Sequence, residues 1–190
     1  MLTLKPLSAE EAPEAAKAQL TAVAGRLGFV PVQQALLAHA PAALNAYAKV
    51  SALLAQSSLT LVERNVVFIT ASRSNRCAYC VAAHSAGAGI DRDILTAVRD
   101  GQTIVGKPRL DALRVFVERV VEQRGFLAPE ELDDFLAAGF TEPQVLEVIT
   151  AIALKTLSNY TNHLLEAPLD EAFEPYAWPT PAGSGQAVSK

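Results

Sequence analysis

The chain has 190 residues, of which 51% are hydrophobic but only 6% are aromatic, and its formal net charge is −4. This length suits one domain with a sizeable core, and an apolar composition poor in aromatic residues favours packed helices over a β-sandwich. An acidic chain without a basic cluster argues against nucleic-acid binding, and no apolar run is long enough to span a membrane or to act as a signal peptide. We therefore expect a cytoplasmic protein with neither nucleic acid nor a membrane as a partner.

Four helices are predicted in the first 75 residues from helix start and stop signals. Ser8 and Glu11 have the spacing of a capping box, as do Thr60 and Glu63, and glycines and prolines separate the segments between them. His39 ends its helix and is interpreted as a partner of the helix dipole rather than as a ligand. The predicted helices span about residues 8–25, 30–39, 41–56 and 60–75. Pro13 lies inside the first of them, so its start is expected at residue 8 or a few residues later.

Five more helices are predicted before the Pro-, Gly- and Ser-rich segment that begins at residue 168. They span about residues 75–87, 91–100, 108–124, 129–138 and 141–165. No segment shows the alternation of a half-buried strand, so the predicted fold class is all-α, with residues 1–167 as a single domain. Residues 168–190 are rich in Pro, Gly and Ser and are expected to form an extended arm with a frayed end. In this arm Trp178 is interpreted as an anchor into a groove of a neighbouring subunit.

Both cysteines of the chain lie in one short motif, Cys77-Ala78-Tyr79-Cys80, and His84 follows one turn later. In a helix these spacings place the two thiols and the imidazole on one face. Two such thiols can close an intramolecular disulfide, a helix start lowers a thiol pKa, and an imidazole can accept or return a proton. The motif therefore has the minimum equipment for dithiol redox chemistry, with no cofactor and no metal.

Two structural interpretations compete with the redox one. Buried free cysteines can pack as small hydrophobic side chains. A closed zinc site is the other, but it needs four ligands, whereas Cys77, Cys80 and His84 supply three. Only His39, His163 or a carboxylate could complete it. The position of the only two cysteines next to each other and to a histidine favours redox chemistry.

Residues 63–68, with the sequence Glu-Arg-Asn-Val-Val-Phe, lead into the cysteine motif and resemble the alkylhydroperoxidase D / carboxymuconolactone decarboxylase superfamily. The resemblance is to the peroxidase-related branch, which keeps C-x-Y-C-x-x-x-H, and it extends to residues 159–163 and 168–178. It implies a single-domain helical bundle, a thiol peroxidase of antioxidant defence that reduces organic hydroperoxides, and a homo-oligomer, as a trimer or hexamer. The decarboxylase branch lacks the cysteine pair and is disfavoured.

The resemblance also implies roles for the two thiols. Cys80 would become the sulfenic acid, Cys77 would donate a proton and then resolve the intermediate, and a dithiol reductant or reducing protein would regenerate the pair. Helix-dipole reasoning instead favours Cys77, the more N-terminal thiol, as the nucleophile of lower pKa. The order of attack therefore stays open between the two cysteines.

The family relays protons through a glutamate twelve residues before the first cysteine, where this chain has Asn65. An asparagine can orient His84 by a hydrogen bond but cannot exchange protons. The nearby Glu63 is interpreted as part of the helix start, and Glu147 is a candidate for a replacement acid. This departure keeps open a second function class, a redox-inactive or weakly active helical binding or scaffold protein of the same superfamily.

The resemblance and the helical pattern also predict where three further residues lie. Asn162 and His163 lie late on a mainly apolar helix, and the resemblance implies that they border the cysteine pocket. Tyr79 points away from the face of the two thiols in a helical motif. It is therefore expected to pack or to line a subunit contact.

Overall fold

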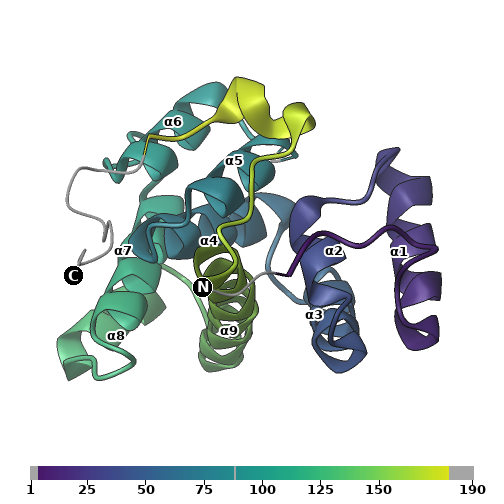
Figure 1. The fold of residues 1–190 in the computed structure, drawn as a ribbon. Coiled ribbons are helices and arrows are strands. Elements are labelled where there is room, and N and C mark those ends of the chain that lie inside the picture. The colour runs from purple at the N-terminus through teal and green to yellow at the C-terminus, as the bar shows by residue number, and fades with distance from the viewer. Residues whose placement is uncertain (1–3, 88, 180–190) are drawn as a thin grey trace, which may run out of the picture.

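The computed structural model describes residues 4–87 and 89–179, and in these ranges all regular structure is helical (Figure 1). The predicted all-α fold class is therefore confirmed. The elements are α1 (Glu14–Leu27), α2 (Val32–Leu37), α3 (Pro41–Leu54), α4 (Leu61–Ser74), α5 (Ala78–Ala86), α6 (Arg92–Asp100), α7 (Pro108–Glu122), α8 (Pro129–Ala137), α9 (Glu142–Leu164) and the short 3-10 helix η1 (Glu171–Tyr176).

The capping signals form as expected, but only one of the first two opens a helix directly. Thr60 and Glu63 exchange hydrogen bonds of 2.8 and 3.2 Å at the start of α4. Ser8 and Glu11 make the same reciprocal pair at 2.9 and 3.2 Å. Here α1 begins only after Pro13, because the residue before a proline is disfavoured in the α conformation. The first capping box therefore closes an isolated turn.

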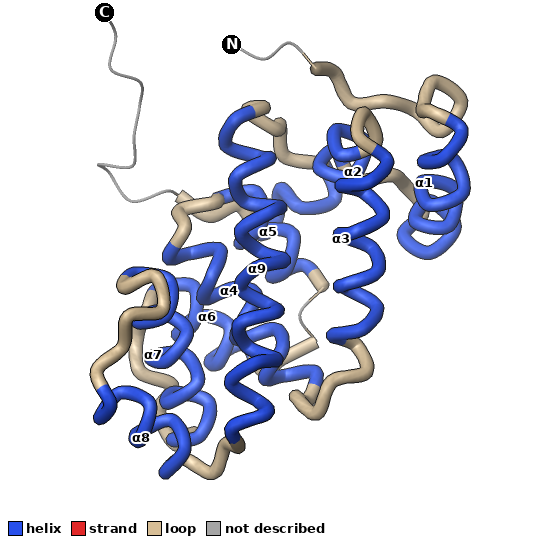
Figure 2. The backbone as a smooth tube through the Cα atoms, turned by 90° about the horizontal axis from the view of Figure 1, so that it is seen from below, coloured by secondary structure: helices blue, strands red, loops and turns tan. Residues whose placement is uncertain are grey.

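Helix α4 lies at the centre of the bundle and contacts α5, α6, α7 and α9 (Figure 2). Glu63, in its first turn, pairs with Arg109 in the first turn of α7 at 2.8 Å. Arg73, in its last turn, pairs with Glu118 in the last turns of α7. Because the two starts meet and the two ends meet, α4 and α7 run in parallel.

Helix α9 runs in the same direction as α4. Near its start Glu147 accepts hydrogen bonds from the backbone N–H of Ser58 at 2.9 Å and from its hydroxyl at 2.7 Å. Near its end Asn159 accepts from the side-chain amide of Asn75 at 2.9 Å. The C-terminal ends of α4, α7 and α9 therefore gather at one end of the bundle, and the cysteine motif follows α4 at that end.

The C-terminal segment packs onto its own chain. Residues 168–179 do not form the fully extended arm that was predicted, because η1 forms within them and lies against α5 (Figure 1, yellow). Arg99 donates to the backbone carbonyls of Tyr176 at 3.1 Å and Ala177 at 3.0 Å. Trp178 packs against the main core of the same chain, whereas it was predicted to anchor in a groove of a neighbouring subunit. The rest of the expected arm, residues 180–190, lies outside the described residues.

Within the described ranges, no single helix has both the length and the apolar character needed to cross a membrane. Helices α8 and α9 meet that test only when taken together, and they are bent by 108° at the break between them.

Candidate active site

The two cysteines sit at the break between α4 and α5. Cys77 is the N-cap residue of α5, with φ −92° and ψ 92°, so it precedes the helix that was predicted to contain it. Its backbone N–H donates to the carbonyl of Ser72 at 2.8 Å, which ties the break back to α4. Cys80 lies in the first turn of α5. Both thiols are free, and each residue is only 1% exposed.

Polar side chains of α9 converge on the sulfur of Cys80. The side-chain amide of Asn162 donates to Cys80 Sγ at 3.2 Å and reaches Cys77 Sγ at 3.8 Å. The hydroxyl oxygen of Ser158 lies 3.7 Å from Cys80 Sγ. The amide oxygen of Asn162 is buried and has no hydrogen-bond partner within the described residues. This end of α9 therefore offers donors to Cys80 and one unused acceptor beside it.

A buried lysine completes the site. Lys155 is 1% exposed, and its Nζ lies 2.7 Å from Nε2 of His84. An ammonium group can only donate, so Nε2 must accept and the proton of the neutral imidazole must sit on Nδ1. The ring of Phe68 stacks on His84 with centroids 4.9 Å apart and lies 6.0 Å from the lysine nitrogen. His84 is thus held between α4 and α9.

The pKa values of the two thiols are driven apart. Burial alone would raise the pKa of Cys80, but a hydrogen bond from Cys77, the positive charge of Lys155 and hydrogen bonds from Ser158 and Asn159 outweigh it and lower that pKa to about 5. The pKa of Cys77 is raised, first by the hydrogen bond it gives to Cys80 and then by burial. At neutral pH these directions leave Cys80 as the thiolate and Cys77 as the thiol.

The imidazole is kept neutral by the same surroundings. Burial lowers the pKa of His84 well below its usual value, and the adjacent charge of Lys155 lowers it further. A neutral imidazole whose Nε2 already accepts a hydrogen bond cannot take a proton from Cys80 at that nitrogen. His84 is therefore arranged to position Lys155 rather than to act as the base that generates the thiolate.

The structure brings together only some of the residues that sequence analysis grouped around the cysteines. Asn65 is buried on α4 and lies three positions before Phe68, on the side of α4 that faces His84. His163 is exposed, and its ring lies against Tyr160 with centroids 6.4 Å apart, so it does not border the pair. Adjacent helical positions differ by about 100°, which turns it away from the cysteines that Asn162 faces.

Glu147 is also placed away from the cysteines. Glu147 is hydrogen-bonded to Ser58. On α9 it lies eleven residues before Ser158, the residue beside Cys80, which is about 16 Å along the helix axis. It cannot replace the relay glutamate of the resembled family. Among the described residues, no three His, Cys, Asp or Glu side chains gather in a group that could hold a metal ion.

Sequence analysis missed Lys155, although its sequence context contained a signal. The segment Ala151-Ile152-Ala153-Leu154-Lys155 places one lysine in an apolar stretch of a helix. Lysine is almost never fully buried without a partner, so a lysine at such a position indicates either an edge of the core or a functional site. Its partner, His84, is 71 residues away in the chain and only the packing of α5 on α9 reveals it.

The C-terminal segment seals the cysteines from solvent. Ala167, Leu169 and Phe173 pack against the cluster formed by Cys77, Tyr79 and Cys80. The segment is held in place by Asp170. A substrate must displace part of this cover to reach either sulfur.

Asp170 joins the cover to the rest of the molecule. Its carboxylate accepts from the backbone N–H of Val32 at 3.1 and 3.3 Å and from the hydroxyl of Tyr79. The ring of Tyr79 packs edge-on against Phe173 with centroids 6.0 Å apart. Tyr79 therefore packs within its own chain, and burial, followed by the bond to Asp170, raises its pKa.

We expect Asp170→Ala to increase the rate at which iodoacetamide alkylates the folded, reduced protein by about tenfold, because hydrogen bonds to a charged group each contribute about 1.5–3 kcal/mol. The matched control is Glu174→Ala, since Glu174 is exposed on the same segment and its side chain makes no hydrogen bond or ion pair to the described residues. Loss of free thiol, or mass spectrometry of the alkylated protein, measures the rate. Equal rates in both variants and the wild-type protein would show that Asp170 does not hold the cover.

Part of the chain is similar to a known protein family, and its whole fold is similar to solved structures. Residues 30–118 match the carboxymuconolactone decarboxylase family. No curated protein sequence matches the chain. A structure described as an alkylhydroperoxidase AhpD core, from an uncharacterized peroxidase-related protein of Ralstonia eutropha JMP134, aligns with a TM-score of 0.80 and 23% identity, over 90% of this chain and 93% of that one.

Two other solved structures have the same fold at lower identity. The debrominase Bmp8 aligns with a TM-score of 0.78 and 16% identity, over 93% of this chain and 96% of that one. An uncharacterized peroxidase-related protein from Silicibacter sp. TM1040 aligns with a TM-score of 0.67 and 17% identity, over 90% of this chain and 95% of that one. The chain thus matches the carboxymuconolactone decarboxylase family over residues 30–118 and has the fold of AhpD-like, peroxidase-related proteins.

Proposed function

We propose that the protein is a thiol peroxidase that reduces organic hydroperoxides through a dithiol–disulfide cycle of Cys77 and Cys80. The observation that carries the proposal is the arrangement around Cys80, where a hydrogen bond from Cys77, the buried cation of Lys155 and two polar side chains from α9 lower the pKa of one thiol while its neighbour stays protonated. A thiolate is the nucleophilic form of cysteine, and it attacks peroxides where a thiol does not.

In the first step the thiolate of Cys80 attacks the terminal oxygen of the hydroperoxide. The S–O bond forms as the O–O bond breaks, so the sulfur is oxidised to sulfenic acid and the substrate leaves as an alkoxide. The adjacent thiol of Cys77 protonates the alkoxide to the alcohol. The unpaired amide oxygen of Asn162 is available to accept the O–H of the incoming hydroperoxide, next to the sulfur that attacks it.

In the second step Cys77, now a thiolate, attacks the sulfur of the sulfenic acid. The disulfide forms and hydroxide leaves, taking up one proton from solvent to become water. Overall, the thiolate of Cys80, the thiol of Cys77, one hydroperoxide and one proton give one disulfide, one alcohol and one water. An external dithiol or a reducing protein must then return two electrons to the disulfide.

Lys155 takes over the task that the resembled family assigns to a glutamate. A glutamate base would remove the proton of the attacking thiol, whereas the charge of Lys155 favours the thiolate before substrate arrives. His84 would hold that lysine in place by accepting its hydrogen bond. Asn65, which stands at the position of the glutamate, is then not required to exchange a proton.

Homo-oligomer formation, as a trimer or hexamer, is part of the proposal. Its support is a set of exposed leucines around the hydrogen bond between Ser58 and Glu147: Leu53, Leu61 and Leu146 are 66%, 55% and 66% exposed. Exposed apolar side chains grouped in this way are typical of protein interfaces. The aromatic residues of the C-terminal segment do not support it, because they pack within their own chain.

The proposal predicts that the reduced protein loses two thiols for each molecule of cumene hydroperoxide and forms one molecule of the alcohol. Thiol titration together with chromatographic measurement of the alcohol tests this stoichiometry. Protein alkylated under denaturing conditions and refolded is the control, and it should consume no hydroperoxide. If the hydroperoxide leaves the thiol count of the reduced protein unchanged, the peroxidase assignment is wrong and the scaffold interpretation gains support.

A bromopyrrole should be included as a competing electrophile, because the structural neighbour Bmp8 is a debrominase that has been solved with 2,3,4-tribromopyrrole. A dithiol can supply the two electrons for replacing bromine by hydrogen, with release of bromide. Thiol loss accompanied by bromide release, and not by alcohol formation, would identify the halide rather than the hydroperoxide as the substrate class.

A further inference from the structure

An apolar groove separate from the cysteine pair lies between α7, the α7–α8 connection, α8 and α9. Its volume is about 710 Å³, which is in the range of sites for small molecules. Neither cysteine lines it. Its apolar wall includes Phe116, Val120, Leu132, Val145 and Ile152.

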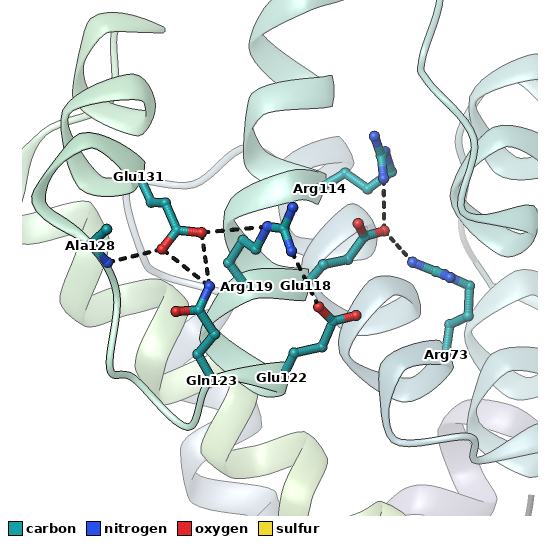
Figure 3. Close-up of polar contacts among 8 residues, drawn as sticks. All are labelled: Arg73, Arg114, Glu118, Arg119, Glu122, Gln123, Ala128 and Glu131. Carbon is teal, nitrogen blue, oxygen red and sulfur yellow. Dashed lines mark hydrogen bonds and ion pairs between the residues drawn. The ribbon is translucent and has the colours of Figure 1, made fainter.

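One edge of the groove is fixed by hydrogen bonds and an ion pair in the α7–α8 connection (Figure 3). The carboxylate of Glu131 accepts from the backbone N–H of Ala128 at 2.9 Å and from the side-chain amide of Gln123 at 2.8 and 3.1 Å. It also pairs with Arg119 at 3.4 Å. These contacts hold the connection against α7 without any ligand, so the groove is preformed.

Arg124 is the only charged residue among those that line the groove. It follows α7 with a left-handed φ of 56°, and its exposed guanidinium makes no hydrogen bond or ion pair to any other described residue. The neighbouring Arg119, in contrast, is paired with Glu122 at 3.7 Å and with Glu131 (Figure 3). An unpaired guanidinium on an apolar groove is complementary to an anionic group attached to an apolar body.

The polar and apolar parts of the groove lie at different ends. Asn75, Arg124 and Tyr160 lie at or just beyond the C-terminal ends of α4, α7 and α9, which meet at one end of the bundle. Val145 lines the groove from the start of α9, at the opposite end. The groove therefore runs from a polar end with one positive charge to an end lined by aliphatic side chains.

We propose that this groove binds an amphipathic anion, a carboxylate carried on an apolar chain. The carboxylate bonds the guanidinium of Arg124, and the chain extends between α8 and α9 toward Val145. Such a ligand pairs with the only charged residue that lines the groove and fills a preformed apolar space. The site does not depend on the proposed peroxidase function, because no reacting group of that function contributes to it.

Isothermal titration of the full chain with decanoate and with decyltrimethylammonium tests the charge requirement, since the two probes share a chain length and differ in the sign of the headgroup. We expect saturable binding of decanoate and much weaker binding of the cation. Arg124→Met should weaken decanoate binding by about tenfold, as expected for the loss of a charge-assisted hydrogen bond. Arg26→Met is the control, because Arg26 is exposed on α1 far from the groove, and it should bind as the wild-type protein does.

A variant of the groove rim separates this ligand from a protein partner. Ile149 lines the groove and is 45% exposed, so Ile149→Asp should fold, as circular dichroism can check, and should lose decanoate binding. Absence of decanoate binding to the wild-type protein, equal binding of both probes, or unchanged binding by Arg124→Met each overturns the proposal. An oligomer that excludes decanoate and that Ile149→Asp dissociates in sedimentation equilibrium also overturns it, because a second copy would then occupy the groove.

Discussion

Lys155→Met is expected to raise the pKa of Cys80 above its value of about 5 and to slow the reaction with hydroperoxides at pH 7 by about tenfold. The variant removes the positive charge that lowers this pKa, and it leaves burial, which raises the pKa, opposed only by the hydrogen bonds from Cys77, Ser158 and Asn159. Methionine has a similar length and suits the apolar surroundings, so the free energy of unfolding should not fall as it would for a deleted side chain. Rapid mixing with cumene hydroperoxide measures the rate, and the ultraviolet absorbance of the thiolate measures the pKa.

The lowered pKa of Cys80 determines how the reaction rate depends on pH. A thiol whose pKa is lowered is ionised above that pKa, so the wild-type rate should be level from about pH 6 to 8 and should fall as the pH drops through about 5. In Lys155→Met the rate should instead rise with pH across the neutral range. The matched control is Lys49→Met, which removes an exposed lysine of α3 and should keep the wild-type profile. Identical profiles for the two variants would rule out a role for Lys155 in forming the thiolate.

Cys80→Ser is expected to abolish hydroperoxide reduction, whereas Cys77→Ser should retain the first step and lose turnover. The difference follows from the opposite pKa shifts of the two thiols, which leave Cys80 as the thiolate. In Cys77→Ser the sulfenic acid has no resolving partner, so dimedone should trap it on Cys80, with a loss of one thiol for each hydroperoxide. Mass spectrometry of the trapped product identifies the sulfur. A sulfenic acid on Cys77 in the Cys80→Ser variant would reverse the two roles.

The variants Cys77→Ser and Cys80→Ser also test which of two electrostatic effects decides which thiol ionises. The dipole of a short helix favours negative charge at its first residues and so favours Cys77, the N-cap. The donors of α9 and the charge of Lys155 favour Cys80. Direct hydrogen bonds and a full charge outweigh a partial helix charge, so we assign the thiolate to Cys80.

Much of the fold could be predicted from sequence because helix boundaries depend on neighbouring residues. The predicted segments of about residues 60–75 and 141–165 correspond to α4 and α9, since capping boxes and glycines act over three or four positions. The C-terminal segment differs from the prediction, whereas the later start of the first helix agrees with the position of Pro13. Pro13 delays α1 through a local steric effect, whereas η1 is held by Arg99 and by the packing of Phe173, which lie outside any local pattern.

The sequence by itself determined the motif of Cys77, Cys80 and His84, because their spacing along one segment needs no tertiary information. Only the tertiary structure decided which groups act on them. It placed Lys155 against His84 and Asn162 against Cys80, while it turned His163 to solvent and left Glu147 beside Ser58. The electrostatic influence of a side chain depends on its distance in space, and these distances are set by how α9 packs on α4 and α5. No pattern within α9 alone contains that information.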